Sequence, residues 1–350
     1  MIEKEINILI AYGTRPEYIK ILPILKAFKS RINYKTLFTG QHTTLIGNHN
    51  PDYIIKIDEG SNRLDSILQS NLNLSDQIFE NVDYVMVQGD TTSALSLAMA
   101  SFHRKIKVIH LEAGLRTYNR EAPWPEEANR QMISRITSVH LCPTEQNLMN
   151  LQKENCQGNM FVCGNTVLDN LIDYPKNVEY QNIILVTLHR RENHVIIDEY
   201  FEAINELAKI YSEHVFIAPL HPNPNVQQHK HLLSSKNILV SEPLPYDELL
   251  QTLTKCKFVI SDSGGIQEEA SFLGKKVIVC REYTERTEGV GIHSFLCKKP
   301  SQLFQIFNNV INDYVLHEPS PYGDGYSAEK ITNYLIEHER FIEIKQEQAH

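Results

Sequence analysis

The stretch VISDSGGIQEEASFLGKKVIV, residues 259–279, contains two apolar runs separated by a helical pattern. Such an order of strand, helix and strand builds a parallel sheet. Ser263, Gly264 and Gly265 stand where the first run ends, and glycines at a helix start let a ligand approach the backbone N–H groups, which attract anions. The stretch therefore predicts either a phosphate site or a plain turn in which Ser263 caps the helix.

The same alternation of apolar runs and helical patterns extends along the chain. The runs are 6–13, 34–40, 84–90, 107–114 and 139–144 in the first half, and 182–190, 214–222, 237–244, 257–265 and 275–282 in the second. Continuous apolar strands separated by helices are typical of parallel sheets covered on both faces. The pattern predicts an α/β protein with two doubly wound, Rossmann-like domains that face each other across a cleft.

The chain has 350 residues, which is long for a single core, so two domains are expected. We place an N-terminal α/β domain at 1–168 and a C-terminal α/β domain at 175–335, with a hinge in the softer segment 165–182. A terminal helix at 336–350 could pack back on the first domain. Ligands of such sheets bind beyond the carboxyl ends of the strands, so chemistry is expected there.

Composition narrows the classes of function. Hydrophobic residues make up 42% of the chain and charged residues 22%, as in globular proteins. The net charge of −9 argues against nucleic acid as a partner. No apolar stretch reaches the ~20 residues of a membrane span, and the N-terminus does not resemble a secretory signal, so a cytoplasmic location is expected. The six cysteines lack paired spacing, which favours reduced core thiols over disulfides or a metal site.

Two charged residues near the glycine turn suggest a nucleotide. Glu269 lies one turn into the helix, where a carboxylate can accept hydrogen bonds from the two hydroxyls of a ribose. Arg286 follows the next strand and either neutralises a diphosphate or forms a surface ion pair. With Gly264 and Gly265 at the phosphates, the stretch predicts a nucleotide site without any P-loop or dinucleotide motif.

Three acidic residues in the first half are candidates for acid–base chemistry. Asp90 and Glu112 end neighbouring strands, and Glu126 belongs to PWPEEANR at 123–130. Carboxylates crowded into one partly dry site can act as acid and base. The alternative is that Asp90 caps the following helix and that Glu126 is a favourable helix start.

Three basic residues complete the candidate site. Lys20, one turn after Arg15, is either a balancing cation for the carboxylates or a solvated side chain. His189, at a strand end in the second half, could bind phosphate or move a proton, although a histidine at a strand end is often structural. Neither a metal nor a redox cofactor is implied by any motif.

Taken together, the motifs resemble those of the bacterial non-hydrolysing UDP-N-acetylglucosamine 2-epimerases over essentially the whole chain. They are GTRPEYIK (13–20), TGQH (39–42), GDTT (89–92), HLEAGLRT (110–117), PWPEEANR (123–130), GNTVLD (164–169), TLHRREN (187–193), HPNPNV (221–226), SDSGGIQEEA (261–270) and SPYGDG (320–325). The resemblance implies the glycosyltransferase B-type fold, a UDP-N-acetylhexosamine substrate in the interdomain cleft, UDP as a ligand, and a homodimer.

The resemblance also implies roles for individual residues. The expected catalytic residues are Asp90, Glu112, Glu126 and His189. The expected substrate-binding residues are Arg15, Lys20, His189, Ser263, Gly264, Gly265, Glu269 and Arg286. The expected reaction is elimination of UDP to a glycal followed by re-addition, which inverts C2 and needs no cofactor.

Three alternatives to this reading stay open. The substrate could be a 6-deoxy L-sugar analogue instead of the UDP-GlcNAc/UDP-ManNAc pair. The enzyme could be the hydrolysing relative, which releases free N-acetylmannosamine and UDP. A UDP-sugar glycosyltransferase is a further alternative, although three acids at one site are unusual for that class.

Overall fold

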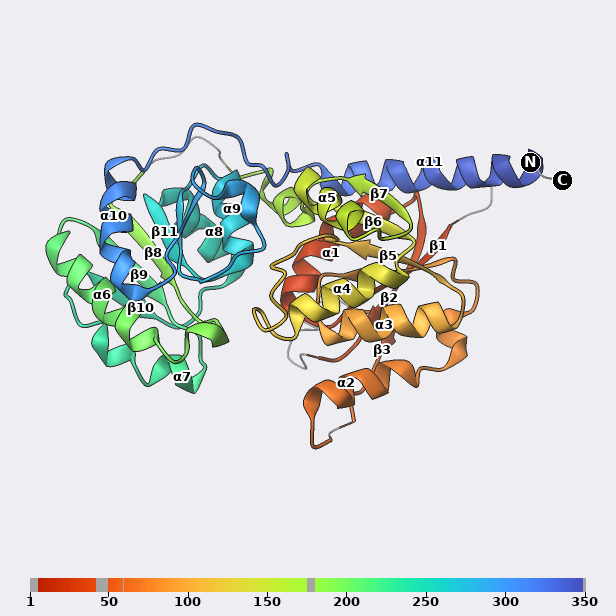
Figure 1. Cartoon of the computed structure of the whole chain (residues 1–350), viewed down its shortest axis with the longest axis horizontal. Coiled ribbons are helices and arrows are strands. Elements are labelled where there is room, and N and C mark those ends of the chain that lie inside the picture. Colours follow the sequence, from red (N-terminus) through yellow and green to blue (C-terminus); the bar gives the residue numbers. More distant parts are fainter. Residues whose placement is uncertain (1–5, 42–49, 59, 175–179, 349–350) are drawn as a thin grey trace. The chain divides into compact units, whose positions relative to one another are not determined.

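The computed structural model describes residues 6–41, 50–58, 60–174 and 180–348. His42 of the TGQH motif and the predicted domain limits at 1, 175 and 350 lie outside these segments. The chain forms two compact units: unit 1 comprises Met1–Asn170 and Gly323–His350, and unit 2 comprises Leu171–Tyr322. Both units are parallel sheets flanked by helices, which confirms the predicted α/β class (Figure 1).

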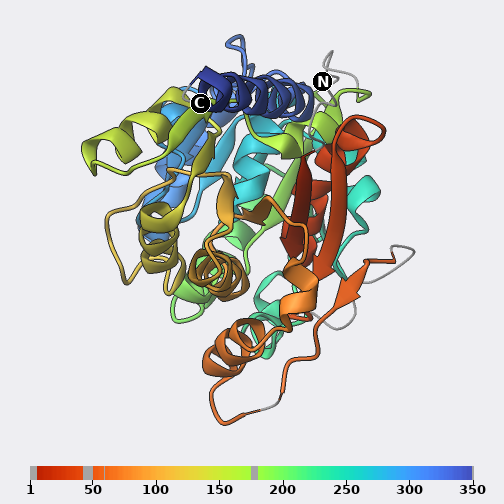
Figure 2. The same ribbon diagram turned by 90° about the vertical axis from the view of Figure 1, so that its right-hand side faces the viewer.

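Unit 1 contains a seven-stranded parallel sheet in the order β3-β2-β1-β4-β5-β6-β7. Its strands are β1 (Asn7–Tyr12), β2 (Asn33–Phe38), β3 (Tyr53–Ile54), β4 (Tyr84–Gln88), β5 (Lys107–Leu111), β6 (Val139–Cys142) and β7 (Asn159–Val162). The five strands predicted in this half are confirmed, whereas β3 and β7 were not predicted. Figure 2 shows β1 and β2, both red, side by side in this sheet.

Helices cover both faces of the first sheet. They are α1 (Arg15–Phe28), α2 (Arg63–Leu72), α3 (Thr92–His103), α4 (Glu126–Ile136), α5 (Glu145–Lys153) and α11 (Ser327–Gln348). Ile8 and Ile10 point to the face where α1 and α11 pack. Leu9 and Ala11 point to the opposite face, where α3 packs, because successive side chains of a strand alternate.

Helix α11 belongs to unit 1 although it lies at the end of the chain (Figure 1). Ala328, Ile331 and Leu335 are buried in the core that α1 shares with the sheet. Asp169 accepts hydrogen bonds from the main-chain nitrogens of Ser327 and Ala328, at 3.1 and 2.7 Å. The sequence prediction ended the second domain at 335, and these apolar contacts instead group residues 323–335 with unit 1.

Unit 2 contains a six-stranded parallel sheet in the order β10-β9-β8-β11-β12-β13. Its strands are β8 (Ile183–Thr187), β9 (Val215–Pro219), β10 (Ile238–Ser241), β11 (Phe258–Ser261), β12 (Val277–Val279) and β13 (Ser294–Leu296). The five strands predicted in this half are confirmed, and β13 was not predicted. The opening stretch of sequence forms β11, α9 and β12 in this unit, as predicted.

The helices of unit 2 also lie on both faces of their sheet. They are α6 (Ile197–Ile210), α7 (Pro224–Gln227), α8 (Tyr246–Lys255), α9 (Gly264–Phe272) and α10 (Leu303–Asn312). Helices α6 and α10 bury Phe201, Ile204 and Phe307 against β8 and β9. Helix α8 contacts β8, and α9 contacts β11 and β12. This packing fixes the carboxyl ends of β8 and β11, which carry the candidate residues of the unit.

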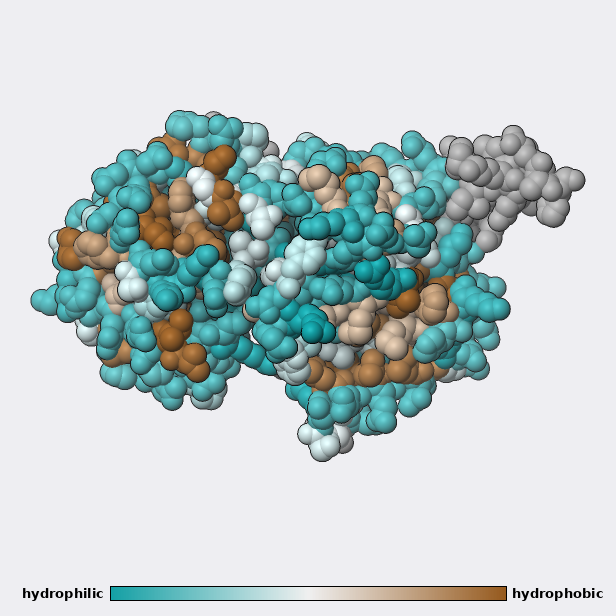
Figure 3. Space-filling model, viewed as in Figure 1, coloured by the Kyte–Doolittle hydropathy of each residue, from teal (hydrophilic) through white to brown (hydrophobic). Residues whose placement is uncertain are grey.

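All six cysteines are free and buried, which confirms the predicted core thiols. Each helix in the described segments is too short or too polar to cross a membrane. Among the described residues, no group of three or more His, Cys, Asp and Glu side chains is arranged to hold a metal ion. Figure 3 shows polar residues over much of the visible face of each unit, with apolar residues in separate patches.

Candidate active site

Glu112 and Lys20 form an ion pair at the carboxyl end of β5. The Lys20 Nζ lies 2.6 Å from both carboxylate oxygens, and both side chains are largely buried. Gln88 donates to Oε2 at 2.5 Å and Asn165 donates to Oε1 at 3.0 Å. The sequence left two alternatives for Lys20, a balancing cation or a solvated side chain, and this contact supports the balancing cation. One cation and two amides thus fix the position of the Glu112 carboxylate.

The backbone of Glu112 is in the left-handed region, with a φ of +68°. Such a conformation is unfavourable for a residue with a Cβ and clusters at functional sites. A Cβ on Gly89, at the end of β4, would lie 3.6 Å from the Glu112 carboxylate. The turn therefore aims Glu112 at the tip of the neighbouring strand.

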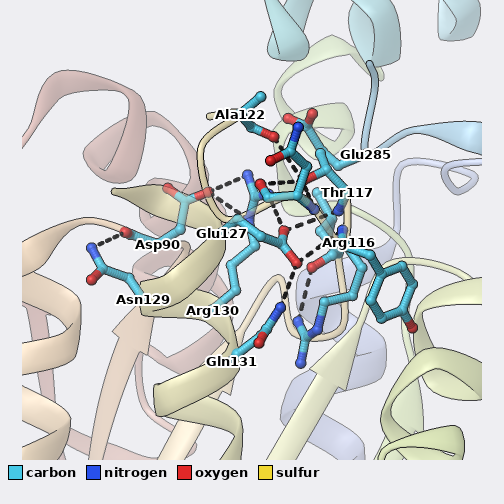
Figure 4. A network of polar contacts seen from close by, with 12 residues as sticks. Asp90, Arg116, Thr117, Ala122, Glu127, Asn129, Arg130, Gln131 and Glu285 are labelled. Carbon is cyan, nitrogen blue, oxygen red and sulfur yellow. Dashed lines mark hydrogen bonds and ion pairs between the residues drawn. The ribbon is translucent and has the colours of Figure 1, made fainter. Parts of the chain in front are cut away.

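Asp90 follows β4 and pairs with Arg130 of α4 (Figure 4). Arg130 donates from Nη2 and Nε to Asp90 Oδ2, at 2.6 and 2.9 Å. Asn129 donates from its side chain to the Asp90 carbonyl at 2.8 Å. The cap of α3 is Thr91, whose Oγ1 accepts from the main-chain nitrogen of Ala94. The alternative that Asp90 caps this helix is therefore wrong.

His110 on β5 contacts the turn at Gly89, which directly precedes Asp90. Its Nε2 lies 2.8 Å from the carbonyl oxygen of Gly89, and the ring is fully buried. Burial lowers the pKa of His110 to about 4. The ring is therefore neutral near pH 7 and donates its Nε2 proton to Gly89. Asp90 thus follows a residue whose carbonyl is fixed.

Glu126 is the first residue of α4, which agrees with the alternative that it is a favourable helix start. The next residue, Glu127, is fully buried. Glu127 accepts from the main-chain nitrogens of Thr117 and Tyr118, at 2.9 and 3.2 Å. Arg130 donates to the same carboxylate at 3.1 Å (Figure 4). Glu127 therefore joins the loop after β5 to α4, which also carries Glu126.

The start of α1 is held by a capping box. Thr14 accepts from the main-chain nitrogen of Glu17, and the buried Glu17 carboxylate accepts from the main-chain nitrogen of Thr14. Burial raises the pKa of Glu17, and Thr91 donates to it at 2.6 Å. This arrangement fixes the first turn of α1, where Arg15 is exposed and Lys20 follows one turn later.

In unit 2, Ser263, Gly264 and Gly265 form the turn into α9. Ser263 holds the N-cap position, but in the described structure its side chain makes no capping hydrogen bond. The structure therefore does not support the alternative in which the Ser263 side chain caps this helix. A Cβ on Gly264 would lie 2.5 Å from Arg286 Nη1. A Cβ on Gly265 would meet none of the described atoms within 4 Å. Gly264 is thus packed, and Gly265 borders open space.

Arg286 is buried and lies between two carboxylates. Its Nε is 3.0 Å from Glu268 Oε1, and its Nη1 is 2.6 Å from Glu285 Oε1. Arg281 pairs with the other oxygen of Glu285 at 3.0 Å. The surface ion pair expected as the alternative for Arg286 is therefore wrong, because the pair lies inside unit 2.

The neighbouring acidic residues of α9 have separate partners. Glu268 pairs with Arg286, whereas Glu269 accepts a hydrogen bond of 2.7 Å from the hydroxyl of Tyr246. Burial beside Glu269 raises the pKa of Tyr246, so this hydroxyl stays protonated and donates. Glu269 is nearly buried, at 5% exposure.

His189 lies just beyond β8 and stacks on His221, with ring centroids 5.6 Å apart. Its Nδ1 is 3.7 Å from Oδ1 of the fully buried Asp262. Burial lowers the pKa of His189, and the charge of Asp262 opposes that shift. The ring is thus held beside a carboxylate at the end of β11.

The family model for UDP-N-acetylglucosamine 2-epimerase matches residues 26–336. A UDP-N-acetylglucosamine 2-epimerase of Campylobacter jejuni is 38% identical, over 94% of this chain and 97% of the relative. The chain belongs to the UDP-N-acetylglucosamine 2-epimerase family. It is therefore an epimerase-type enzyme, as the motifs predicted.

Solved structures agree with this family. The crystal structure of the UDP-GlcNAc 2-epimerase from Neisseria meningitidis, bound to UDP-GlcNAc, has a TM-score of 0.85 and 34% identity, and the match covers 95% of this chain and all of that one. MurG of Acinetobacter baumannii has a TM-score of 0.55 and 14% identity, with 95% and 100% coverage, and shows the fold alone. These likenesses confirm the predicted glycosyltransferase B-type architecture.

Several residues in contact with the predicted site residues of each unit were not themselves predicted. They are Gln88, Glu127, Arg130, Asn165 and Asp262, and each contacts a predicted residue or shares a partner with one. Three of the motifs that signalled the family contain four of these residues. PWPEEANR contains Glu127 and Arg130, GNTVLD contains Asn165, and SDSGGIQEEA contains Asp262, whereas Gln88 directly precedes GDTT. The polar residues inside those motifs were the available signal.

Proposed function

We propose that the chain catalyses reversible C2 epimerisation of a UDP-N-acetylhexosamine by eliminating UDP to a glycal and adding it back. The substrate is UDP-GlcNAc with UDP-ManNAc, or a 6-deoxy L-sugar analogue. The observation that carries the proposal is the pair of strand-end carboxylates, Asp90 and Glu112, each ion-paired with its own cation in a chain of this family. The relative from Neisseria meningitidis, whose structure contains UDP-GlcNAc, supports the choice of substrate.

The reaction explains why carboxylates are needed. The C2 proton of the sugar is not adjacent to a carbonyl, so removing it alone is unfavourable. Loss of UDP from C1 accompanies that proton transfer, and the glycal then accepts UDP again while C2 is protonated on the other face. We assign this acid–base work to Asp90, Glu112 and Glu126. Lys20 and Arg130 place a cation beside Glu112 and Asp90, and an adjacent positive charge favours the ionised form of a carboxylate, which suits a proton acceptor.

The nucleotide is assigned to unit 2 and to the first helix of unit 1. Gly265 borders open space at the N-terminus of α9, where free N–H groups suit a diphosphate. We assign the ribose to Glu269, because a carboxylate one turn into the helix can accept hydrogen bonds from sugar hydroxyls and Tyr246 already orients this side chain. The remaining proposed contacts are Arg15, Lys20, His189, Ser263, Gly264 and Arg286.

The assembly and location are proposed as well. We expect a homodimer, which light scattering of the purified protein would test. The six free, buried thiols suit a reducing compartment, and this supports the cytoplasm as the site of action.

The proposed mechanism is tested by running the reaction in D₂O with UDP-GlcNAc and following it by proton NMR. The epimerised product should carry deuterium at C2 and keep its bond to UDP. Free N-acetylmannosamine and UDP in equal amounts would identify the hydrolysing reaction instead. A chain that is inert without an acceptor would identify a glycosyltransferase, and an epimerised product without deuterium would exclude elimination and re-addition.

A further inference from the structure

Asp262 connects the ends of two neighbouring strands in unit 2. It directly follows β11, which pairs with β8 so that Ser261 lies opposite Thr187. Its carboxylate accepts from the main-chain nitrogens of His189 and Arg190, at 3.0 and 2.9 Å. Because Ser263 comes next in the chain, Asp262 holds the His189 loop to the turn that begins α9.

The Asp262 carboxylate is fully buried, and its hydrogen-bond donors are themselves fixed. Asn193 donates to it at 3.0 Å and donates at 2.8 Å to the carbonyl of Cys280, at the end of β12. An unpaired buried carboxylate is costly, so these N–H donors are what make the charge tolerable without a ligand. The charge therefore favours a positive neighbour.

His189 is placed to be that neighbour. Its Nδ1 is 3.7 Å from Asp262 Oδ1, which is too long for a direct hydrogen bond but close enough for a strong charge interaction. A bare Nδ1 lone pair facing this carboxylate would be repelled, so the neutral ring carries its proton on Nδ1. The other charged or titratable groups near the ring are Arg190, Glu192 and His221.

We propose that Asp262 is a positioning residue that fixes His189 with Nε2 available to a phosphate of a nucleoside diphosphate and stabilises the ring as a cation once that phosphate binds. This inference rests on the proposed function, since it needs a nucleoside diphosphate as the ligand of unit 2. Asp262 itself contacts no ligand and acts through His189. The carboxylate–histidine pair is a common way to fix a ring tautomer.

Isothermal titration of UDP into four variants of the full chain tests the proposal. Asp262→Asn should weaken UDP binding roughly tenfold, because the His189 ring loses the carboxylate that orients it and stabilises its cation. His189→Gln should weaken it at least as much. The double variant should bind UDP no more weakly than His189→Gln alone, because both changes remove one function. Thr187→Val removes the buried 2.7 Å hydrogen bond to Ser261 nearby and should leave UDP affinity unchanged.

Losses that add in the double variant, or unchanged affinity in either single variant, would overturn the proposal. Nitrogen-15 NMR of the unaltered protein without ligand provides a second test that needs no variant to fold. The neutral His189 ring should carry its proton on Nδ1, and a proton on Nε2 would overturn the proposal. If the unaltered protein fails to bind UDP, the proposed function fails, whereas the NMR result still decides the role of Asp262.

Discussion

Arg130 is the residue that links the carboxylates of Asp90 and Glu127 in unit 1. It donates to Asp90 and to Glu127, and its side chain is only 5% exposed. We expect Arg130→Gln to lower the turnover of UDP-GlcNAc by ~10²-fold, because Asp90 loses the cation that orients it. UDP affinity, measured by titration, should change little, since most of the proposed UDP contacts lie in unit 2.

A neighbouring arginine offers a matched control for this prediction. Arg135 lies on the same helix, and its side chain is 55% exposed. Arg135→Gln should therefore keep both turnover and the melting temperature, because exposed ion pairs contribute little. Circular dichroism must first show that Arg130→Gln is folded, since breaking a buried pair costs about 3–5 kcal/mol. A folded variant with ordinary turnover would show that Arg130 has no part in positioning Asp90.

At the residue scale, the sequence predicted which residues stand at strand ends but not what they contact. Lys20 and Glu112 are 92 positions apart and meet only because β1 and β5 lie in one sheet. Arg286 was expected at a diphosphate, and its burial between Glu268 and Glu285 could not be read from spacing. Such partners depend on how strands and helices pack, which local patterns do not contain.

At the scale of elements, the two glycines at the start of α9 differ in their surroundings. A Cβ on Gly264 would press on Arg286, whose position is fixed by two carboxylates, whereas a Cβ on Gly265 would enter open space. We expect Gly264→Ala to destabilise the fold by about 1–3 kcal/mol through overpacking. Gly265→Ala should keep the melting temperature and weaken UDP binding, because its methyl group would occupy space assigned to the diphosphate.

Thermal melting and UDP titration of both glycine variants separate these effects. Each variant is the control of the other, because both place one methyl group in the first turn of α9. If Gly264→Ala melts as the unaltered protein does, the contact with Arg286 is not restrictive. If Gly265→Ala binds UDP as tightly as the unaltered protein, the diphosphate lies elsewhere.

The sequence predicted the central strands of both sheets and the edge strand β10, but it missed the short strands at the other three edges. The missed strands are β3, β7 and β13, and each lies at one end of its sheet. Only the central strands are buried on both faces, and this produces the continuous apolar runs on which the prediction depended. β7 has no fully buried residue, and β3 has only two residues. Their pairing is thus decided by neighbouring strands.

At the scale of the whole chain, the sequence passes from one unit to the other twice, after Asn170 and after Tyr322. The first was predicted, because the segment 165–182 lacks a strong apolar pattern. The second was placed at 335, since the helical pattern beyond 327 does not reveal which sheet it covers. Ala328, Ile331 and Leu335 lie in one core with residues of α1, which is some 300 positions earlier in the chain. These contacts show that the terminal helix covers the sheet of unit 1.

The stability of unit 2 should depend on pH through Lys275, a lysine with no exposed surface. Its Nζ donates to the Cys256 carbonyl at 2.6 Å and lies 4.2 Å from the centre of the Tyr180 ring. Burial lowers the pKa of Lys275 from 10.5 to about 8. Between these values the unfolded chain binds a proton that the folded chain lacks, so this group's contribution to stability rises as the pH rises.

Comparing the unaltered protein with Lys275→Met isolates this contribution, because titrations common to both proteins cancel in the difference. From pH 7 to pH 10, the unaltered protein should gain on the order of 2 kcal/mol of unfolding free energy relative to the variant, measured by urea denaturation. Lys209→Met is the control for removing a lysine and should change the unfolding free energy little, because that side chain is 54% exposed and its ion pair with Glu206 lies on the surface. The contrary result would be a difference in unfolding free energy between the unaltered protein and Lys275→Met that stays constant or shrinks as the pH rises. It would mean that Lys275 is charged throughout and that its contacts with Cys256 and Tyr180 fully offset its burial.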